Sequence, residues 1–247
     1  MTFILKLFIL IPFAGLVVSL LLPEKNERLI SGVSRIILAI HFIGAQIFLL
    51  FWGIDGFKIL NIKDIVLFKA PNFEFFLDFY FDRVSAVFLL VGSFLTFLVA
   101  VYSKNYLHRE SGYKRFFTTI LLFYVGYNLT IFSGNMETLF IGWEFLGISS
   151  FLLIAFYRER YLPVKNAVKV FSVYRLGDIG IILAMWMSHH LWHENVTFLK
   201  LQNAELVHEH LQSHTWIGIF ISFMILVSAA AKSAQLPFSS WLPRAME

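Results

Sequence analysis

The sequence predicts an all-α integral membrane protein with about seven transmembrane helices, and three observations support this. Of the 247 residues, 58% are hydrophobic and only 15% are charged, whereas a soluble domain is about half apolar and about a quarter charged. The mean hydropathy is +0.73. Apolar runs recur at about 20 residues, the length that a helix needs to cross a bilayer, and such runs are too long for β-barrel strands. Disordered, collagen-like and disulfide-scaffold classes are excluded.

Each of seven apolar segments is long enough to be a span. The first has an early Lys6, as a signal peptide would, but Pro23 and two charged residues follow in place of a cleavage site, so we expect a retained helix. The expected spans run from Phe3 to Leu22, Ile30 to Trp52, Val84 to Tyr102, Phe116 to Phe132, Thr138 to Phe156, Ala167 to Ser188 and Trp216 to Leu236.

Lysine and arginine concentrate in the loops 23–29, 103–115 and 157–169, which share one side if all seven spans are real. The positive-inside rule places that side in the cytoplasm and the N-terminus outside. The opposite loops, 53–83 and 189–215, carry fewer basic residues for their length. Basic residues in cytoplasmic loops therefore explain the net charge of +4. We expect the chain to contact membrane lipid and not nucleic acid.

The two long loops have different expected structures. Loop 53–83 is aromatic and is expected to lie at the membrane interface or over the helix bundle, with its aromatic side chains at Phe73, Phe75, Phe76, Phe79, Tyr80 and Phe81. Loop 189–215 is expected to hold a short amphipathic helix near Leu199 to Leu211. His189 and His193 in it could share a helix face and bind a metal, but histidines in polar loops are common and no familiar ligand signature is completed.

Cysteine is absent, which excludes disulfides, thiolate nucleophiles, iron–sulfur clusters and cysteine-bound zinc. The sequence also has no glycine-rich nucleotide loop, no H-E-x-x-H and no G-x-S-x-G pattern. We therefore predict no catalytic site, no cofactor and no metal in this chain, and look for function in the membrane interior.

Four ionisable residues fall inside expected spans: Glu144, Arg175, Asp178 and Lys232. Each costs about 3 kcal/mol at a helix centre, and such residues often mark ion paths. Arg175 and Asp178 are three residues apart and can pair on one helix face, so a structural ion pair and a conducting role are equally supported. Glu144 and Lys232 have no local partner and lie on different helices, which favours conduction over a structural role.

The residues around Glu144 and Lys232 favour close helix packing beside a helix break. Gly142 and Gly147 flank Glu144, and a run of alanines precedes Lys232. Small residues let helices approach closely. Pro237 is expected to break the helix just after Lys232, where the lysine could carry a transferable proton; if the spans are shifted, Glu144 or Lys232 could instead reach an interface.

Three ordered motifs contain the intramembrane charges. They are Gly142-Trp143-Glu144-Phe145-Leu146-Gly147, Tyr174-Arg175-Leu176-Gly177-Asp178-Ile179-Gly180, and Lys232-Ser233-Ala234-Gln235-Leu236-Pro237-Phe238 with Trp241-Leu242-Pro243. These motifs resemble the antiporter-like subunits of respiratory complex I, chain L or mitochondrial subunit 5, and of multi-subunit sodium/proton antiporters. Asp82-Arg83-Val84-Ser85 before the third span fits the same pattern, so the resemblance covers most of the chain from about residue 80.

The resemblance implies an antiporter-like bundle whose seventh helix is broken at Pro237. Residues 1–83 would form two N-terminal helices and an extracytoplasmic loop, and residues 84–247 an incomplete first bundle. The second, inverted repeat of the family is missing, so the chain is expected to be an N-terminal fragment. Glu144 and Lys232 would be the coupled pair of a half-channel, and Arg175 and Asp178 would tune the path or bind a neighbouring subunit.

Within that family the sequence is most similar to DabB, the membrane subunit of a two-component inorganic-carbon accumulation system. The likeness lies in residues 158–166, in the His189-His190 pair and in Trp241 to Glu247. It implies that flow of H⁺ or Na⁺ energises uptake of bicarbonate or CO2 with a large soluble DabA-like partner, which resembles a carbonic anhydrase and would hold the zinc.

The alternative is a proton-pumping L chain of NADH:quinone oxidoreductase, or a subunit of a sodium/proton antiporter, with other membrane subunits as partners. The redox chemistry would then lie in other chains. All of these place the chain in the bacterial inner membrane. A receptor-like or purely structural seven-helix protein is disfavoured by the intramembrane Glu144 and Lys232 beside a proline break.

Overall fold

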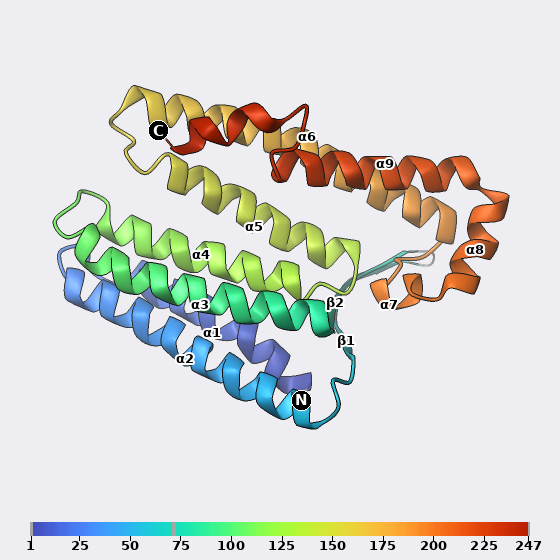
Figure 1. Cartoon of the computed structure of the whole chain (residues 1–247), viewed down its shortest axis with the longest axis horizontal. Coiled ribbons are helices and arrows are strands. Elements are labelled where there is room, and N and C mark those ends of the chain that lie inside the picture. The colour runs from blue at the N-terminus through green and yellow to red at the C-terminus, as the bar shows by residue number, and fades with distance from the viewer. Residues whose placement is uncertain (1, 71–72, 247) are drawn as a thin grey trace.

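A computed structural model describes residues 2–70 and 73–246. Long helices lie side by side, and a β-hairpin and short helices gather at one end (Figure 1). The long helices are α1 (Thr2–Leu21), α2 (Glu27–Ile54), α3 (Arg83–Tyr106), α4 (Tyr113–Ile131), α5 (Met136–Ile154), α6 (Tyr161–Trp192) and α9 (Thr215–Lys232). The remaining elements are β1 (Leu60–Ala70), β2 (Phe73–Phe81), α7 (Phe198–Leu201), α8 (Ala204–Ser213), η1 (Ser239–Trp241) and η2 (Pro243–Met246).

Among the described residues, six helices are long and apolar enough to cross a membrane: α1, α2, α3, α5, α6 and α9. The predicted multi-pass helical membrane fold is confirmed, but the predicted number of seven spans is not. The difference is α4, which lies alongside the others (Figure 1) but contains Lys114, Arg115 and Asn128. It can be more polar because it is enclosed, with Phe117 and Leu121 fully buried.

Side-chain caps fix where several helices begin. Asn26 accepts a hydrogen bond from the Leu29 N–H at 3.2 Å, and Asp82 accepts one from the Ser85 N–H at 2.9 Å. Asn135 does the same for α5. Such caps satisfy backbone donors that the first helical turn leaves free. The Asp82–Ser85 motif therefore has a structural role as the N-cap of α3.

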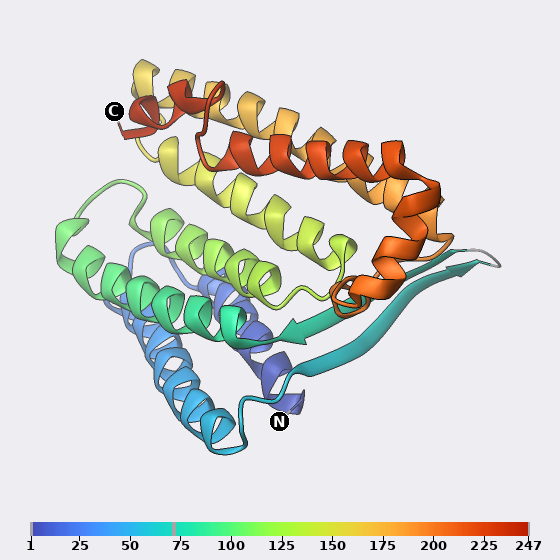
Figure 2. The ribbon, with the colours of Figure 1, turned by 45° about the vertical axis from the view of Figure 1, so that its right-hand side comes forward.

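Loop 53–83 is a β-hairpin, which the all-α expectation missed. β1 and β2 pair antiparallel from Leu60 opposite Phe81 to Ala70 opposite Phe73, with two irregularities in register. The hairpin projects beyond the helices in Figure 2. The run that forms β2 is rich in aromatic residues, which favour strands. The side chain of Phe73, one of the predicted interfacial aromatics, lies outside the described residues.

The hairpin is attached to the bundle by backbone hydrogen bonds and by an aromatic core. The Tyr80 N–H donates to the Phe132 carbonyl at 2.8 Å. Phe81 is fully buried, with its ring centroid 5.2 Å from that of Phe48 and 5.0 Å from that of Trp52. Edge-to-face aromatic pairs of this kind add stability beyond their buried area. The hairpin base is thus part of the core shared by α1, α2, α3 and α4, and the domain boundary at residue 83 stays a prediction.

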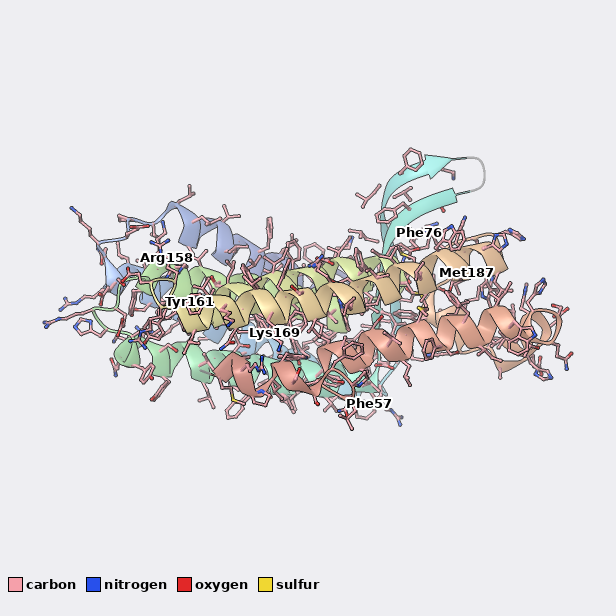
Figure 3. All side chains as sticks on the ribbon, turned by 90° about the horizontal axis from the view of Figure 1, so that it is seen from above. Phe57, Phe76, Arg158, Tyr161, Lys169 and Met187 are labelled. Carbon is pink, nitrogen blue, oxygen red and sulfur yellow. The ribbon has the colours of Figure 1, made fainter. Side chains whose placement is uncertain are left out.

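The loops group at the two ends of the bundle as predicted. The α1–α2, α3–α4 and α5–α6 connections lie at one end, and the hairpin, α7 and α8 lie at the other (Figure 1). Figure 3 shows Arg158 and Tyr161 at one end of α6, with Met187 toward the opposite end. The predicted amphipathic helix near Leu199 to Leu211 corresponds to α7 and α8. Which end faces the cytoplasm stays a prediction.

Candidate functional site

The four predicted intramembrane residues meet where α5, α6 and α9 pack together, and Arg175 of α6 is at the centre. Its two terminal nitrogens donate to the two carboxylate oxygens of Glu144 on α5, at 3.0 and 2.7 Å. Its Nε lies 3.1 Å from Oδ2 of Asp178, one turn along α6. Bidentate contacts of this type are the strong form of an ion pair. Two carboxylates therefore share one guanidinium.

Trp143 joins Lys232 and Asp178 to this cluster. Its indole Nε1–H donates to Asp178 Oδ1 at 2.7 Å, and its backbone carbonyl accepts a hydrogen bond from Lys232 Nζ at 2.7 Å. The ammonium also lies 4.2 Å from the centroid of the Trp143 ring and 5.2 Å from that of Tyr174. Aromatic faces attract a cation at such distances. We call Trp143, Glu144, Arg175, Asp178 and Lys232 the Arg175 network.

Glu144 and Lys232, the predicted coupled pair, form no ion pair with each other in the structure. Glu144 is held by Arg175, and the functional coupling of Glu144 to Lys232 stays a prediction. Within the described residues, no carboxylate forms an ion pair with Lys232. The alternative that Glu144 or Lys232 reaches a membrane interface stays a prediction. Sequence reasoning missed Trp143, although its place directly before Glu144 in the first motif was a signal.

Glycine and serine residues let α6 and α9 approach closely enough to form the network. The hydroxyl of Ser228 on α9 donates to the Gly177 carbonyl on α6 at 2.7 Å. A Cβ on Gly177 would lie 3.1 Å from the Ala231 Cβ, so a larger residue would push the helices apart. Interfaces of small residues with interhelical hydrogen bonds are typical of membrane helix packing. Gly177 of the second motif thus serves the packing of α6 on α9.

The helix break lies beside Lys232, earlier than Pro237 suggested. α9 ends at Lys232, and Ala234 has a positive φ of 54°. A helix end inside a membrane leaves carbonyls that need donors. The chain returns at Trp241, whose indole Nε1–H donates to the Ala231 carbonyl at 2.8 Å. Pro237 lies in the turn that permits this return, and the Lys232 ammonium sits at the negative end of the helix dipole.

The side chains of the Arg175 network differ in how far they are exposed. The side chain of Asp178 is only 5% exposed, whereas those of Glu144 and Arg175 are 21% and 39% exposed. Two acids and two bases sum to zero charge, so the cluster can be held in a membrane interior. Chemically, the arrangement can hold a proton on Lys232 and can exchange the partners of Arg175 between two carboxylates.

The histidines near the end of α6 do not form a metal centre in the described part of the chain. No group of three or more His, Cys, Asp or Glu residues there is placed to hold a metal ion. The rings of His190 and His193 stand 6.3 Å apart, and His210 packs at 4.2 Å on Trp192. The metal interpretation of His189 and His193 therefore gains no support.

Helices carrying a closed ion-pair network beside a broken helix define a membrane subunit of the antiporter-like class. Residues 133–247 match the transmembrane family of NADH:quinone oxidoreductase and Mrp antiporters, and residues 67–117 match the N-terminal family of complex I chain 5. The chain belongs to this antiporter-like family.

The relatives agree with this assignment. The chain is 28% identical over 248 residues to NADH-quinone oxidoreductase subunit L of Rickettsia bellii and 31% over 250 residues to that of Neisseria meningitidis. It is 32% identical over 180 residues to the chloroplastic NAD(P)H-quinone oxidoreductase subunit 5 of Mesostigma viride. These matches cover 98%, 96% and 71% of the chain but only 38%, 36% and 27% of the relatives. The chain thus spans less than two-fifths of their length.

Two solved structures share the fold. A chain of the archaeal membrane-bound sulfane sulfur reductase matches with a TM-score of 0.79 and 18% identity, covering 98% of this chain and 47% of that one. A chain of the Mrp complex from Dietzia matches with a TM-score of 0.79 and 21% identity, covering 98% and 25%. At these identities the likeness concerns the fold alone.

Proposed function

We propose that this chain handles the transported proton in an antiporter-like membrane subunit of the complex I or Mrp type. The observation that carries the proposal is the pairing within the Arg175 network. Glu144 is held by Arg175, and the Lys232 ammonium is hydrogen-bonded to a neutral carbonyl. An ammonium without a carboxylate partner gives up its proton more readily than an ion-paired one.

The exchange of partners provides a way to move that proton. When Arg175 releases Glu144 and stays paired with Asp178, the Glu144 carboxylate becomes free to attract positive charge, and Lys232 on α9 is the other cation of the network. When Arg175 returns, Lys232 is again held by neutral groups and releases its proton. Lys232 is the last residue of α9, and discontinuous helices with charged groups at such ends are typical of transport sites.

The test is proton translocation by the complete protein in sealed membrane vesicles, followed with a pH-sensitive dye. Glu144→Gln keeps the shape of the side chain but removes its charge, so we expect translocation to fall by about tenfold or more while the protein still inserts. Glu159→Gln, which changes an exposed acid in the α5–α6 turn, is the matched control. Wild-type translocation in Glu144→Gln would refute the proposal.

The partners and location follow from the same proposal. We propose other membrane subunits as neighbours and the bacterial inner membrane as the location, with the N-terminus outside and the basic loops in the cytoplasm. None of the relatives named above is described as an inorganic-carbon transporter, so carbon uptake with a DabA-like zinc partner stays a prediction. Purification of the complete protein from its native membrane, with mass spectrometry, decides between quinone-reducing or antiporter subunits and one large zinc protein.

A further inference from the structure

A second buried carboxylate, Glu137, lies in the first turn of α5, two helical turns or about 10 Å from Glu144. Glu137 is 5% exposed, and its Oε2 atom is buried without a hydrogen-bond partner. In the part of the chain that the structure describes, no cation forms an ion pair with it. A buried, unpaired negative charge is costly unless something neutralises it.

The side chain of Asn195, in the segment that follows α6, presents a second acceptor near Glu137. Its Nδ2 donates to the Glu74 carbonyl of the hairpin at 2.6 Å, which fixes the orientation of the amide. Its Oδ1 is therefore turned the other way, and this atom is also buried without a partner. The Phe198 N–H donates to the Gly134 carbonyl at 2.7 Å, which holds the segment against the start of α5.

A cavity of about 10 Å³ lies between these groups, lined by Glu137, Asn195, Ser188, His189 and Glu194 among others. Such a volume holds one water-sized particle. The Ser188 hydroxyl contacts the sulfur of Met136 at 4.0 Å, so its oxygen lone pairs stay available. The residues that line the cavity thus carry a carboxylate, an amide and a hydroxyl group.

The charge balance at the cavity favours a cation over a water molecule. Glu194 is already paired with Lys200, which leaves the charge of Glu137 uncompensated. A water molecule could satisfy two acceptors but would not neutralise this charge. Oxygen ligands suit hard cations, and a divalent ion such as Ca²⁺ takes six to eight of them. One carboxylate with two neutral oxygens in so small a space suits a monovalent ion.

We propose that the cavity between Glu137 and Asn195 binds one Na⁺ ion at the hairpin end of α5 and α6. Glu137 supplies the charge, Asn195 and Ser188 supply neutral oxygens, and the hairpin orients Asn195 through Glu74. The site joins three elements, so the bound ion stabilises their contact. Binding at this site does not require translocation and stands independently of the Arg175 network.

The test is thermal unfolding of the complete protein in lipid nanodiscs while NaCl replaces choline chloride at constant ionic strength. The titration is run at about pH 8.5, where the low proton concentration favours Na⁺ over a proton. A ligand that binds only the folded state raises the melting temperature in a saturable way. We expect such a rise for wild type, an apparent Na⁺ affinity about tenfold or more weaker for Glu137→Gln, and wild-type affinity for the control Glu205→Gln, which changes an exposed acid of α8 outside the cavity.

Two results would overturn the sodium site. The first is no Na⁺-specific stabilisation of wild type, which would mean that a water molecule or a proton occupies the cavity. The second is equal stabilisation of wild type and Glu137→Gln by Na⁺. If Glu137→Gln does not fold, Ser188→Ala decides, because it removes one proposed oxygen ligand and leaves the charge. An unchanged Na⁺ affinity in Ser188→Ala would refute the oxygen set. Neither result would bear on proton translocation through the Arg175 network.

Discussion

Lys232 donates its hydrogen bond to the backbone carbonyl of Trp143, 2.7 Å away, and not to the carboxylate of the adjacent Glu144. That carboxylate is occupied by Arg175. The lysine is therefore held by a neutral oxygen and two aromatic rings at the end of a helix. This relationship makes Arg175 the residue that decides whether Glu144 is available to the lysine.

Arg175→Lys tests the two-point contact with Glu144. The variant keeps the positive charge but replaces the planar fork by a point charge, which cannot hold both carboxylate oxygens and also approach Asp178. We expect normal insertion and proton translocation reduced by about tenfold or more, measured in vesicles. Lys169→Arg, on the same helix, is the control. Full activity in Arg175→Lys would show that the bidentate geometry is not needed.

Trp143→Phe tests the link between Asp178 and Lys232. The phenylalanine keeps an aromatic face and the backbone carbonyl for Lys232, but removes the indole donor that bonds Asp178 at 2.7 Å. Leaving a buried acceptor without that donor should destabilise the protein by about 1 to 3 kcal/mol. Denaturant unfolding in detergent measures this, with Trp186→Phe as the control because Trp186 is 62% exposed. Equal stability of both variants would contradict the role of the indole N–H.

Gly147→Ala tests the space around the ammonium. A Cβ at this position would lie 3.4 Å from Lys232 Nζ, at the lower limit of ordinary van der Waals contact with the ammonium. We expect slower proton translocation with little change in stability, because the lysine side chain can shift by a few tenths of an ångström. Gly32→Ala, where nothing lies within 4 Å of the added carbon, is the matched control. An identical rate in both variants would contradict crowding of Lys232.

Asp78 of the hairpin gives a pH prediction outside the membrane spans. Burial raises the pKa of its carboxyl from 3.8 to about 6, although Lys63 acts in the opposite direction. The folded protein therefore binds a proton more tightly than the unfolded chain, so stability falls as pH rises from about 4 to about 6 and stays low above that. Asp78→Asn should lose this dependence and be more stable than wild type above pH 6.

Hydrogen exchange of the hairpin against pH measures the effect of Asp78. The backbone contacts remain in Asp78→Asn, because the Asp78 N–H bonds to Thr138 and its carbonyl accepts from Gly134. Asp55→Asn, at the exposed end of α2, is the control. A pH dependence that persists unchanged in Asp78→Asn would show that another group is responsible.

The sequence predicts the helices well because each has a local signal. Hydropathy finds the apolar spans, whereas the exact helix starts are fixed in the structure by the side-chain caps of Asp82 and Asn135. Hydropathy does not identify the hairpin, because the aromatic run that ends at Phe81 is equally typical of a segment at the membrane interface. The paired strands depend on β1, whose pairing in register is a non-local property.

The residues of the candidate site are predictable from the sequence, but their pairing is not, because it too is a non-local property. Charged residues in apolar spans identify Glu144, Arg175, Asp178 and Lys232 from sequence alone. Their pairing depends on how α5, α6 and α9 are rotated against one another, which Gly177 and Ser228 settle in the fold. A backbone carbonyl such as that of Trp143 gives no sequence signal. The helix end at Lys232 is fixed by the return of Trp241, not by Pro237 alone.

The most direct test of the central claim, that Lys232 takes up and releases the transported proton, is the translocation rate of Lys232→Arg in the complete protein. Arginine keeps the charge but stays protonated at all relevant pH values. We predict a loss of about tenfold or more across the working pH range, no recovery at alkaline pH, and an equal loss in Lys232→Ala. Wild-type turnover in Lys232→Arg would contradict the claim, because it would show that deprotonation at this position is not required.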